Sequence, residues 1–143
     1  MIVFFDTNVL IYAAVGQRTE PHKCVRATAL VAEGGYATSG QIHAEFYSVV
    51  TSRKYSMPHA EALAWLDDLA RFPVVPLTAA LVAHGARLAD RYRISYWHGA
   101  IVAAAQEIGA ETLFSEDLNA GQVFGSIRVV NPFAQSAMRE LQP

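Results

Sequence analysis

The sequence has almost none of the residues that would crosslink it or carry it into a membrane. Its 143 residues include one cysteine, Cys24, which excludes an internal disulfide framework and a four-thiolate zinc site. A lone thiol is typical of a reducing compartment, so we expect a cytoplasmic protein. No apolar run approaches the ~20 residues of a membrane span. The first residues also lack the basic start and cleavage site of a secretory signal, and we expect no membrane partner.

Charge is also scarce. Charged residues make up 17% of the chain and the formal net charge is -2, so bulk charge gives no sign of nucleic-acid binding. Any contact with phosphate must come from local clusters. Apolar residues are abundant instead, at 52%, which is enough to bury a core in a chain whose length fits one domain.

Short apolar runs alternate with helical patterns along the chain. The expected strands span residues 2–5, 36–38, 74–77, 112–114 and 127–130. The expected helices span residues 7–14, 21–33, from a capping box at 38–41 to about 54, 58–72, 78–93 and 95–108. This alternation predicts an α/β domain over residues 1–133, with a short parallel β-sheet sandwiched by α-helices and a C-terminal tail at 134–143. Sites of such sheets lie beyond the carboxyl ends of the strands.

Two aspartates follow expected strands. Asp6 comes directly after the first strand, where it is either a helix N-cap or a site residue. Asp117 comes just after the strand at 112–114, with Glu116 beside it. Taken alone, the segment 115–117 also has the composition of a polar turn.

Glu45 carries a third carboxylate. Ile42, Phe46 and Val49 recur at helical spacing, and Glu45 falls inside this apolar stripe. A carboxylate on a buried face is unfavourable unless it is paired or binds a cation, so we interpret Glu45 as functional. The alternative is a slightly different helix phase that leaves Glu45 at the edge of the stripe.

Three carboxylates at one edge of a sheet would repel each other and raise their own pKa values unless a cation neutralised them. Hard oxygen ligands of this kind suit Mg²⁺ or Mn²⁺. Such an ion lowers the pKa of bound water and stabilises charge that develops on a phosphate. The acidic residues therefore predict a metal-dependent site.

The stretches that hold these residues closely resemble the PIN-domain family, in particular the VapC toxins of toxin–antitoxin pairs. In order, the similar motifs are FDTNVLIY at 5–12, TSGQIHAEF at 38–46, ISYWHGAIVAAA at 94–105, LFSEDLNAGQ at 113–122 and VVNPF at 129–133. Each motif is weak alone, but all of them in this order are specific, and together they cover nearly the whole chain.

The resemblance implies a parallel sheet sandwiched by helices and a Mg²⁺- or Mn²⁺-dependent endoribonuclease that acts on an RNA substrate. It also implies a homodimer that a cognate antitoxin protein silences. Asp6, Glu45 and Asp117 match family acidic positions. The resemblance places polar support at Thr7 and Asn8 near the first carboxylate, and at Ser115 and Glu116 near the last.

One position departs from the family pattern. The third motif normally has Asp after Ser-Tyr-Trp, and this chain has His98. With Ser95 as the N-cap, His98 is the third helical residue, where a carboxylate would suit the helix dipole better. A neutral imidazole can bind Mn²⁺ or zinc, and Mg²⁺ less readily. His98 is therefore either a fourth metal ligand beside the three carboxylates or the mark of an inactivated site.

Three functions remain open at this point. The first is a metal-dependent endoribonuclease toxin with catalytic and metal-binding residues Asp6, Glu45, His98 and Asp117. The second is a catalytically impaired PIN module that retains antitoxin or RNA binding. The reason to consider it is His98, which stands where the family usually has Asp. The third, a phosphatase with Asp6 as nucleophile, is disfavoured because the acid/base position two residues later is Asn8. Trp65 and Trp97 are interpreted as core residues rather than as platforms for nucleobases.

Overall fold

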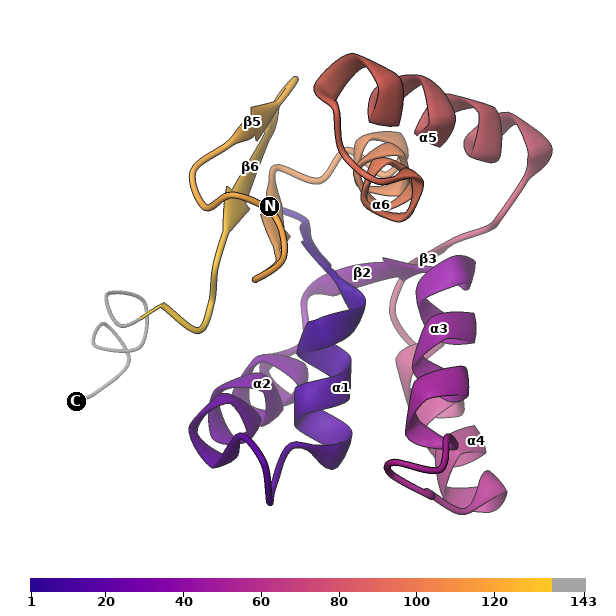
Figure 1. Cartoon of the computed structure of the whole chain (residues 1–143), viewed down its shortest axis with the longest axis vertical. Coiled ribbons are helices and arrows are strands. Elements are labelled where there is room, and N and C mark those ends of the chain that lie inside the picture. The colour runs from indigo at the N-terminus through magenta and orange to yellow at the C-terminus, as the bar shows by residue number, and fades with distance from the viewer. Residues whose placement is uncertain (135–143) are drawn as a thin grey trace.

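A six-stranded sheet forms the centre of the computed structural model, which describes residues 1–134 (Figure 1). The strands are β1 (Val3–Phe5), β2 (Tyr36–Ser39), β3 (Val74–Val75), β4 (Thr112–Phe114), β5 (Val123–Phe124) and β6 (Ile127–Val130). Their order across the sheet is β3-β2-β1-β4-β6-β5. All neighbours are parallel except β5 and β6, which pair antiparallel. The predicted parallel sheet is thus confirmed.

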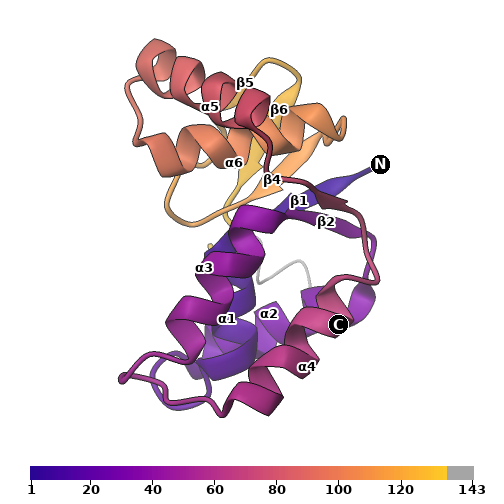
Figure 2. The ribbon, with the colours of Figure 1, turned by 90° about the vertical axis from the view of Figure 1, so that its right-hand side faces the viewer.

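Helices flank the sheet on two sides. They are α1 (Thr7–Val15), α2 (Pro21–Glu33), α3 (Gly40–Val50), α4 (His59–Leu69), α5 (Ala79–Tyr92) and α6 (Tyr96–Glu107). Figure 2 shows the strands between the α5–α6 pair and the group formed by α1 to α4. The predicted α/β architecture is confirmed. Among the helices of residues 1–134, none combines the length and apolar character needed to cross a bilayer.

The central strands are buried because helices cover them on both faces. Phe4 and Phe5 of β1 are buried, and so is every residue of β2. The Phe5 ring stacks on Tyr36 with centroids 4.4 Å apart and on Phe114 at 5.8 Å. These contacts hold β2, β1 and β4 together and fix the edge at which Asp6 emerges.

The sheet differs from the sequence-based prediction at its edges. The strand expected over 74–77 ends at Val75, because Pro76 has no N–H for the ladder. The strand β5 was not predicted at all. It has two residues, of which Val123 is exposed, and a turn with Gly125 at a φ of 63° joins it to β6. So short a segment carries no periodic signal.

The helix α3 begins one residue later than the predicted capping box. Ser39, not Thr38, is the N-cap, and its hydroxyl accepts a hydrogen bond from the Ile42 N–H at 3.3 Å. The helix expected to reach residue 54 ends at Val50, where the Thr51 hydroxyl donates to the Tyr47 carbonyl at 2.7 Å and a turn follows. The helix expected over 58–72 likewise ends early, at Leu69.

The predicted N-cap of α6 is confirmed. The Ser95 hydroxyl accepts a hydrogen bond from the His98 N–H, which makes His98 the third residue of the helix. Gly99 and Gly85 let α6 approach α5 closely, since a Cβ on Gly99 would collide with the Gly85 carbonyl oxygen. The N-terminus of α6 is thereby held in a fixed position. The expected tail at 134–143 lies outside the described residues except for Ala134.

Candidate metal centre

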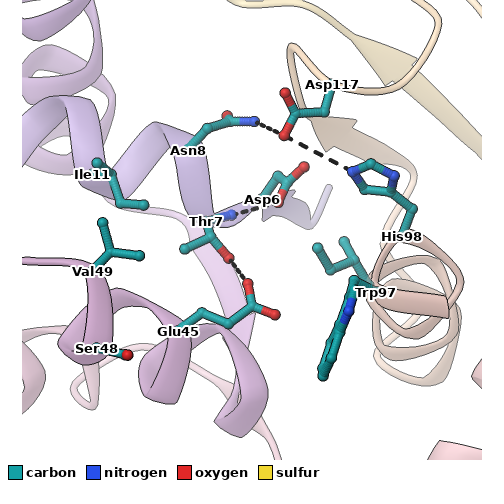
Figure 3. A pocket seen from close by; sticks show the side chains of 11 residues that line it. Asp6, Thr7, Asn8, Ile11, Glu45, Ser48, Val49, Trp97, His98 and Asp117 are labelled. Atoms are coloured by element: carbon teal, nitrogen blue, oxygen red, sulfur yellow. Dashed lines mark hydrogen bonds and ion pairs between the residues drawn. The ribbon is translucent and has the colours of Figure 1, made fainter. Parts of the chain in front are cut away.

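The candidate site lies at the carboxyl edge of the two central strands. β1 and β4 are parallel neighbours with Phe5 opposite Phe114, so the residues that follow them emerge side by side. The Asp6 N–H donates to the Phe114 carbonyl at 2.9 Å, which extends this pairing by one residue. Strand register therefore places Asp6 beside the segment from Ser115 to Asp117. Figure 3 shows the side chains of Asp6 and Asp117 close together.

Asp6 is buried, with 3% of its surface exposed, and both of its oxygens accept hydrogen bonds. The N–H of Thr7, the first residue of α1, donates to Oδ1 at 2.6 Å, and the Ser115 hydroxyl donates to Oδ2 at 2.7 Å. The pKa of Asp6 is raised to about 6, chiefly by burial and to a lesser degree by the negative charge of Asp117, and the hydrogen bonds from Ser115 and Thr7 offset only part of this rise. Asp6 is thus the N-cap of α1 and also a carboxylate whose ionised form is disfavoured by burial.

Asp117 lies opposite Asp6 on the more open side of the site. The Asn8 amide donates to its Oδ2 at 3.1 Å, and its own N–H donates to the Ser115 hydroxyl oxygen at 3.2 Å. Ser115 therefore contacts both aspartates, donating to one and accepting from the backbone of the other. About half of the Asp117 side chain, 54%, remains exposed, so it can reach a ligand from solvent.

His98 faces this pair from the first turn of α6. Its Nε2 lies 3.9 Å from Asp117 Oδ2, and its Nδ1 lies 3.2 Å from the Ser95 hydroxyl oxygen. When Nδ1 carries the proton and donates to Ser95, the lone pair of Nε2 points toward the aspartates. A hydrogen bond of this kind on the second ring nitrogen is typical of histidines that bind metals.

The side chains of Asp6, His98 and Asp117 each offer one ligand atom, and these atoms lie within 4.8 Å of one another. Two carboxylate oxygens and one imidazole nitrogen form a donor set that fits Mn²⁺ well and Mg²⁺ less well. A cation between the carboxylates would also stabilise the charged form of Asp6, which burial and, to a lesser degree, the charge of Asp117 disfavour. The residues present therefore fit a divalent metal ion.

Glu45 lies in the same cleft but outside this three-residue cluster. The Thr7 hydroxyl donates to its Oε2 at 2.8 Å and the Gln41 amide donates to its Oε1 at 3.0 Å. The fully buried residues of α3 include Ile42, Phe46 and Val50, whereas Val49 and Glu45 are half-buried. The helix phase thus leaves Glu45 at the edge of the apolar stripe, which was the alternative to the functional interpretation of this residue.

Glu116 lies outside the metal-binding cluster and contacts α1 and α2 instead. The Tyr12 hydroxyl donates a short hydrogen bond to its Oε1, and Lys23 Nζ lies 2.9 Å from its Oε2. Lys23 also lies over the Tyr12 ring, 5.0 Å from its centroid. These contacts tie the loop that carries Asp117 to α1 and α2.

The cluster opens into a cleft of about 500 Å³. Its lining residues are Asp6, Thr7, Asn8, Ile11, Glu45, Ser48, Val49, Trp97, His98, Ile101 and Asp117. Trp97 was interpreted as a core residue, and this was wrong, because 59% of its surface is exposed. Trp65, by contrast, is half-buried and packs against Phe46 with ring centroids 5.7 Å apart.

Several residues around the site were not singled out from the sequence. Gln41 was detectable in principle, since it lies four residues before Glu45 on the same helix face. Lys23 was not, because 93 residues of sequence separate it from its partner Glu116. The apolar cleft residues Ile11 and Val49 look like ordinary core positions in the sequence.

The fold and the site together define the class of this protein as an α/β domain with an acidic cluster at the carboxyl edge of a parallel sheet. The family model described as PIN domain matches residues 3–123. The chain belongs to the PIN-domain family. A comparison of the sequence with curated proteins gave no match.

Several solved structures have a similar fold, among them a toxin. VapC20 from Mycobacterium tuberculosis, a sarcin–ricin loop cleaving toxin, is similar with a TM-score of 0.65 and 18% identity over 80% of this chain and 91% of that one. VapBC2 from Rickettsia felis, bound to a promoter DNA fragment, is similar with a TM-score of 0.60 and 18% sequence identity, over 90% of this chain and 97% of that one. FitAB bound to a DNA fragment is similar with a TM-score of 0.66 and 22% sequence identity, over 92% of this chain and 96% of that one. At these identities the likeness concerns the fold.

Proposed function

We propose that this PIN domain is a metal-dependent endoribonuclease and the toxin of a toxin–antitoxin pair. The observation that carries the proposal is the cluster of ligand atoms from Asp6, His98 and Asp117 within 4.8 Å, at the edge where parallel sheets form their sites. Membership of the PIN family supports the nuclease activity. The likeness in fold to a sarcin–ricin loop cleaving toxin supports RNA as the substrate.

In this proposal the ion is Mg²⁺ or Mn²⁺, held by Asp6, His98 and Asp117. Such an ion, when bound, supplies an activated water molecule and stabilises charge on the phosphate. Glu45 contributes a further carboxylate to the cleft, oriented by Thr7 and Gln41.

The residues around the ligands are proposed to act through them. Ser115 and Asn8 orient the two aspartates through their hydrogen bonds, and Thr7 donates to Asp6 and to Glu45. Glu116 holds the loop that bears Asp117 through its contacts with α1 and α2. Each of these four is a positioning residue rather than a ligand.

The proposed partners are an RNA substrate, a cognate antitoxin and a second copy of this chain, in the cytoplasm. A further structure of similar fold is a toxin–antitoxin complex from Klebsiella pneumoniae, and this supports an antitoxin partner. An acidic cleft of this kind would accept a basic side chain of the antitoxin in place of the metal ion.

The test is cleavage of a mixed RNA pool by the purified protein with Mn²⁺, with Mg²⁺ and with EDTA. We expect cleavage with Mn²⁺, weaker cleavage with Mg²⁺ and none with EDTA. Asp6→Asn and Asp117→Asn should each remove the activity and weaken Mn²⁺ binding in calorimetry. Asp67→Asn, at an exposed carboxylate of α4 outside the cleft, is the matched control and should change neither.

A second candidate is a PIN module that binds RNA or an antitoxin without cleaving RNA. The observation that favours it is the imidazole of His98 at a position where the family usually has a carboxylate. With His98 Nε2 3.9 Å from Asp117 Oδ2, the site has an imidazole in place of one hard oxygen ligand for Mg²⁺. This candidate predicts no cleavage with either metal ion while binding is retained.

A further inference from the structure

Trp97 is a large aromatic side chain left open to solvent beside the candidate metal centre. It is the second residue of α6 and directly precedes His98. Its relative exposure of 59% is unusual for tryptophan, which is highly buried on average. The Tyr96 ring packs against the indole edge-to-face, with centroids 5.2 Å apart, and supports its orientation.

The cleft around Trp97 has two chemically different parts. One part holds Asp6, His98 and Asp117, which form the metal-binding cluster. The other part holds the apolar side chains of Ile11 and Val49 on the side opposite Trp97, together with the polar side chains of Glu45 and Ser48 (Figure 3). A ligand that combines a group that binds a cation with an uncharged, flat group would suit both parts of this cleft.

We propose that Trp97 is a stacking platform for one unpaired nucleobase of the RNA whose phosphodiester lies at the metal-binding cluster. A nucleotide has the required combination, since its phosphate binds a cation and its base has a π-face. The proposal rests on the proposed ribonuclease function and specifies its substrate as unpaired RNA. Trp97 and His98 are adjacent residues, so one stretch of backbone can serve the base and the phosphate.

Two consequences follow for recognition. Stacking on an indole requires that one face of the base be free, which excludes a base inside a regular duplex. Stacking also tolerates different bases, because every base has a π-face. We therefore expect this contact to select unpaired over paired RNA and to contribute little to the choice of base.

The test measures binding of a short fluorescent oligoribonucleotide without self-complementarity, with Ca²⁺ in place of Mn²⁺ and the RNA checked to be intact. Trp97→Ala should weaken binding by roughly 5- to 150-fold, the range expected for loss of one base–aromatic stack. Trp97→Phe should recover most of the affinity. Leu63→Ala removes an exposed apolar side chain of α4 outside the cleft and should leave binding unchanged.

A second readout uses the protein's own fluorescence. In a Trp65→Phe background Trp97 is the sole tryptophan, and the unpaired oligonucleotide should quench it more strongly than the same sequence annealed to its complement. Binding that is equal in Trp97→Ala and the unmodified protein would overturn the proposal. Equal losses of RNA affinity in Trp97→Ala and Trp97→Phe would also overturn it. The same holds for a Trp97→Ala protein that loses self-association but keeps its RNA affinity.

These binding assays are independent of cleavage. A protein that binds unpaired RNA through Trp97 but never cleaves it would support the stacking platform and contradict the nuclease. A protein that cleaves RNA with Mn²⁺ but binds it equally well without the indole would do the reverse.

Discussion

Asp6 is held in place by contacts that do not fully compensate the burial of its charge. Thr7 and Ser115 donate hydrogen bonds to it, yet burial still raises its pKa to about 6. The folded protein without metal therefore keeps a proton on Asp6 at a pH where the unfolded chain, with a carboxyl pKa near 3.8, has released it. Folding is consequently linked to pH at this residue.

The first prediction concerns the stability of the metal-free protein. Its free energy of unfolding should fall as pH rises from about 4 to about 6, by about 3 kcal/mol from this group, because ionisation is less favourable in the folded state. Denaturant unfolding in EDTA at several pH values measures this. Asp6→Asn should remove the slope in this window, and saturating Mn²⁺ should restore stability above pH 6. If the free energy of unfolding changed with pH in the same way in Asp6→Asn and in the unmodified protein, the raised pKa could not belong to Asp6.

His98 gives the second prediction. His98→Asp would place a carboxylate at the third residue of α6, where the helix dipole favours negative charge, and would add a hard oxygen near the aspartates. Mg²⁺ affinity and cleavage with Mg²⁺ should both rise, by calorimetry and by RNA cleavage. If the unmodified protein already works through the imidazole, it should cleave RNA with Mn²⁺ and prefer Mn²⁺ over Mg²⁺ more strongly than His98→Asp does. Equal metal preference in the two proteins would show that residue 98 does not touch the ion.

At the residue scale the sequence was informative wherever a polar side chain followed a buried strand. Asp6 and Asp117 could be placed at one sheet edge because parallel strands end together, and the structure brings them together. Trp97 could not be placed, because exposure depends on what packs over the N-terminus of α6. Glu45 fell between these cases, since a small error in helix phase changes a buried residue into one at a cleft edge.

At the scale of elements, the position of His98 depends on how α6 packs against α5. Gly85 and Gly99 lie where the two helices meet, and neither leaves room for a side chain. A Cβ on Gly85 would lie 2.8 Å from the Ala100 Cα atom, and one on Gly99 would lie 3.0 Å from the Ala89 Cβ atom. The close approach of the helices therefore requires both glycines.

The third prediction is that Gly99→Ala destabilises the protein by roughly 1–3 kcal/mol, the usual effect of overpacking a close contact. It should also weaken Mn²⁺ binding, because α6 carries His98 and must move away from α5. Gly40→Ala is the matched control. Its added methyl group would meet nothing closer than 3.7 Å, so stability should stay equal or rise. A Gly99→Ala protein with unchanged unfolding and unchanged Mn²⁺ affinity would show that the crossing is not tightly constrained.

The helices and strands themselves were largely predictable from the sequence, but the residues at which they begin and end were not. Apolar runs located β1 and β4, and Ser95 located the start of α6, because these signals are local. The two residues of β5 gave no signal, since their strand character comes only from pairing with β6. The anchoring of the 115–117 segment by Lys23 was equally hidden, because it joins distant parts of the chain.

At the scale of the whole molecule, we expect two copies of this chain to associate. Large apolar side chains remain exposed on the described surface, among them Leu77 at 53% and Val82 at 40%. The fourth prediction is that light scattering at micromolar concentrations and above gives twice the 15.6 kDa mass of one chain. A mass equal to one chain throughout this range would contradict the homodimer.

The whole molecule carries a net charge of only -2, but Asp6 and Asp117 bring two carboxylates together beside His98. The proposed function follows from a cation bound at that place. The most direct measurement is anomalous diffraction from a crystal soaked with Mn²⁺, recorded at the manganese edge. We predict one strong peak in contact with the side chains of Asp6, His98 and Asp117. An empty cleft, or manganese bound only by carboxylates elsewhere on the surface, would contradict the metal centre on which the proposed function depends.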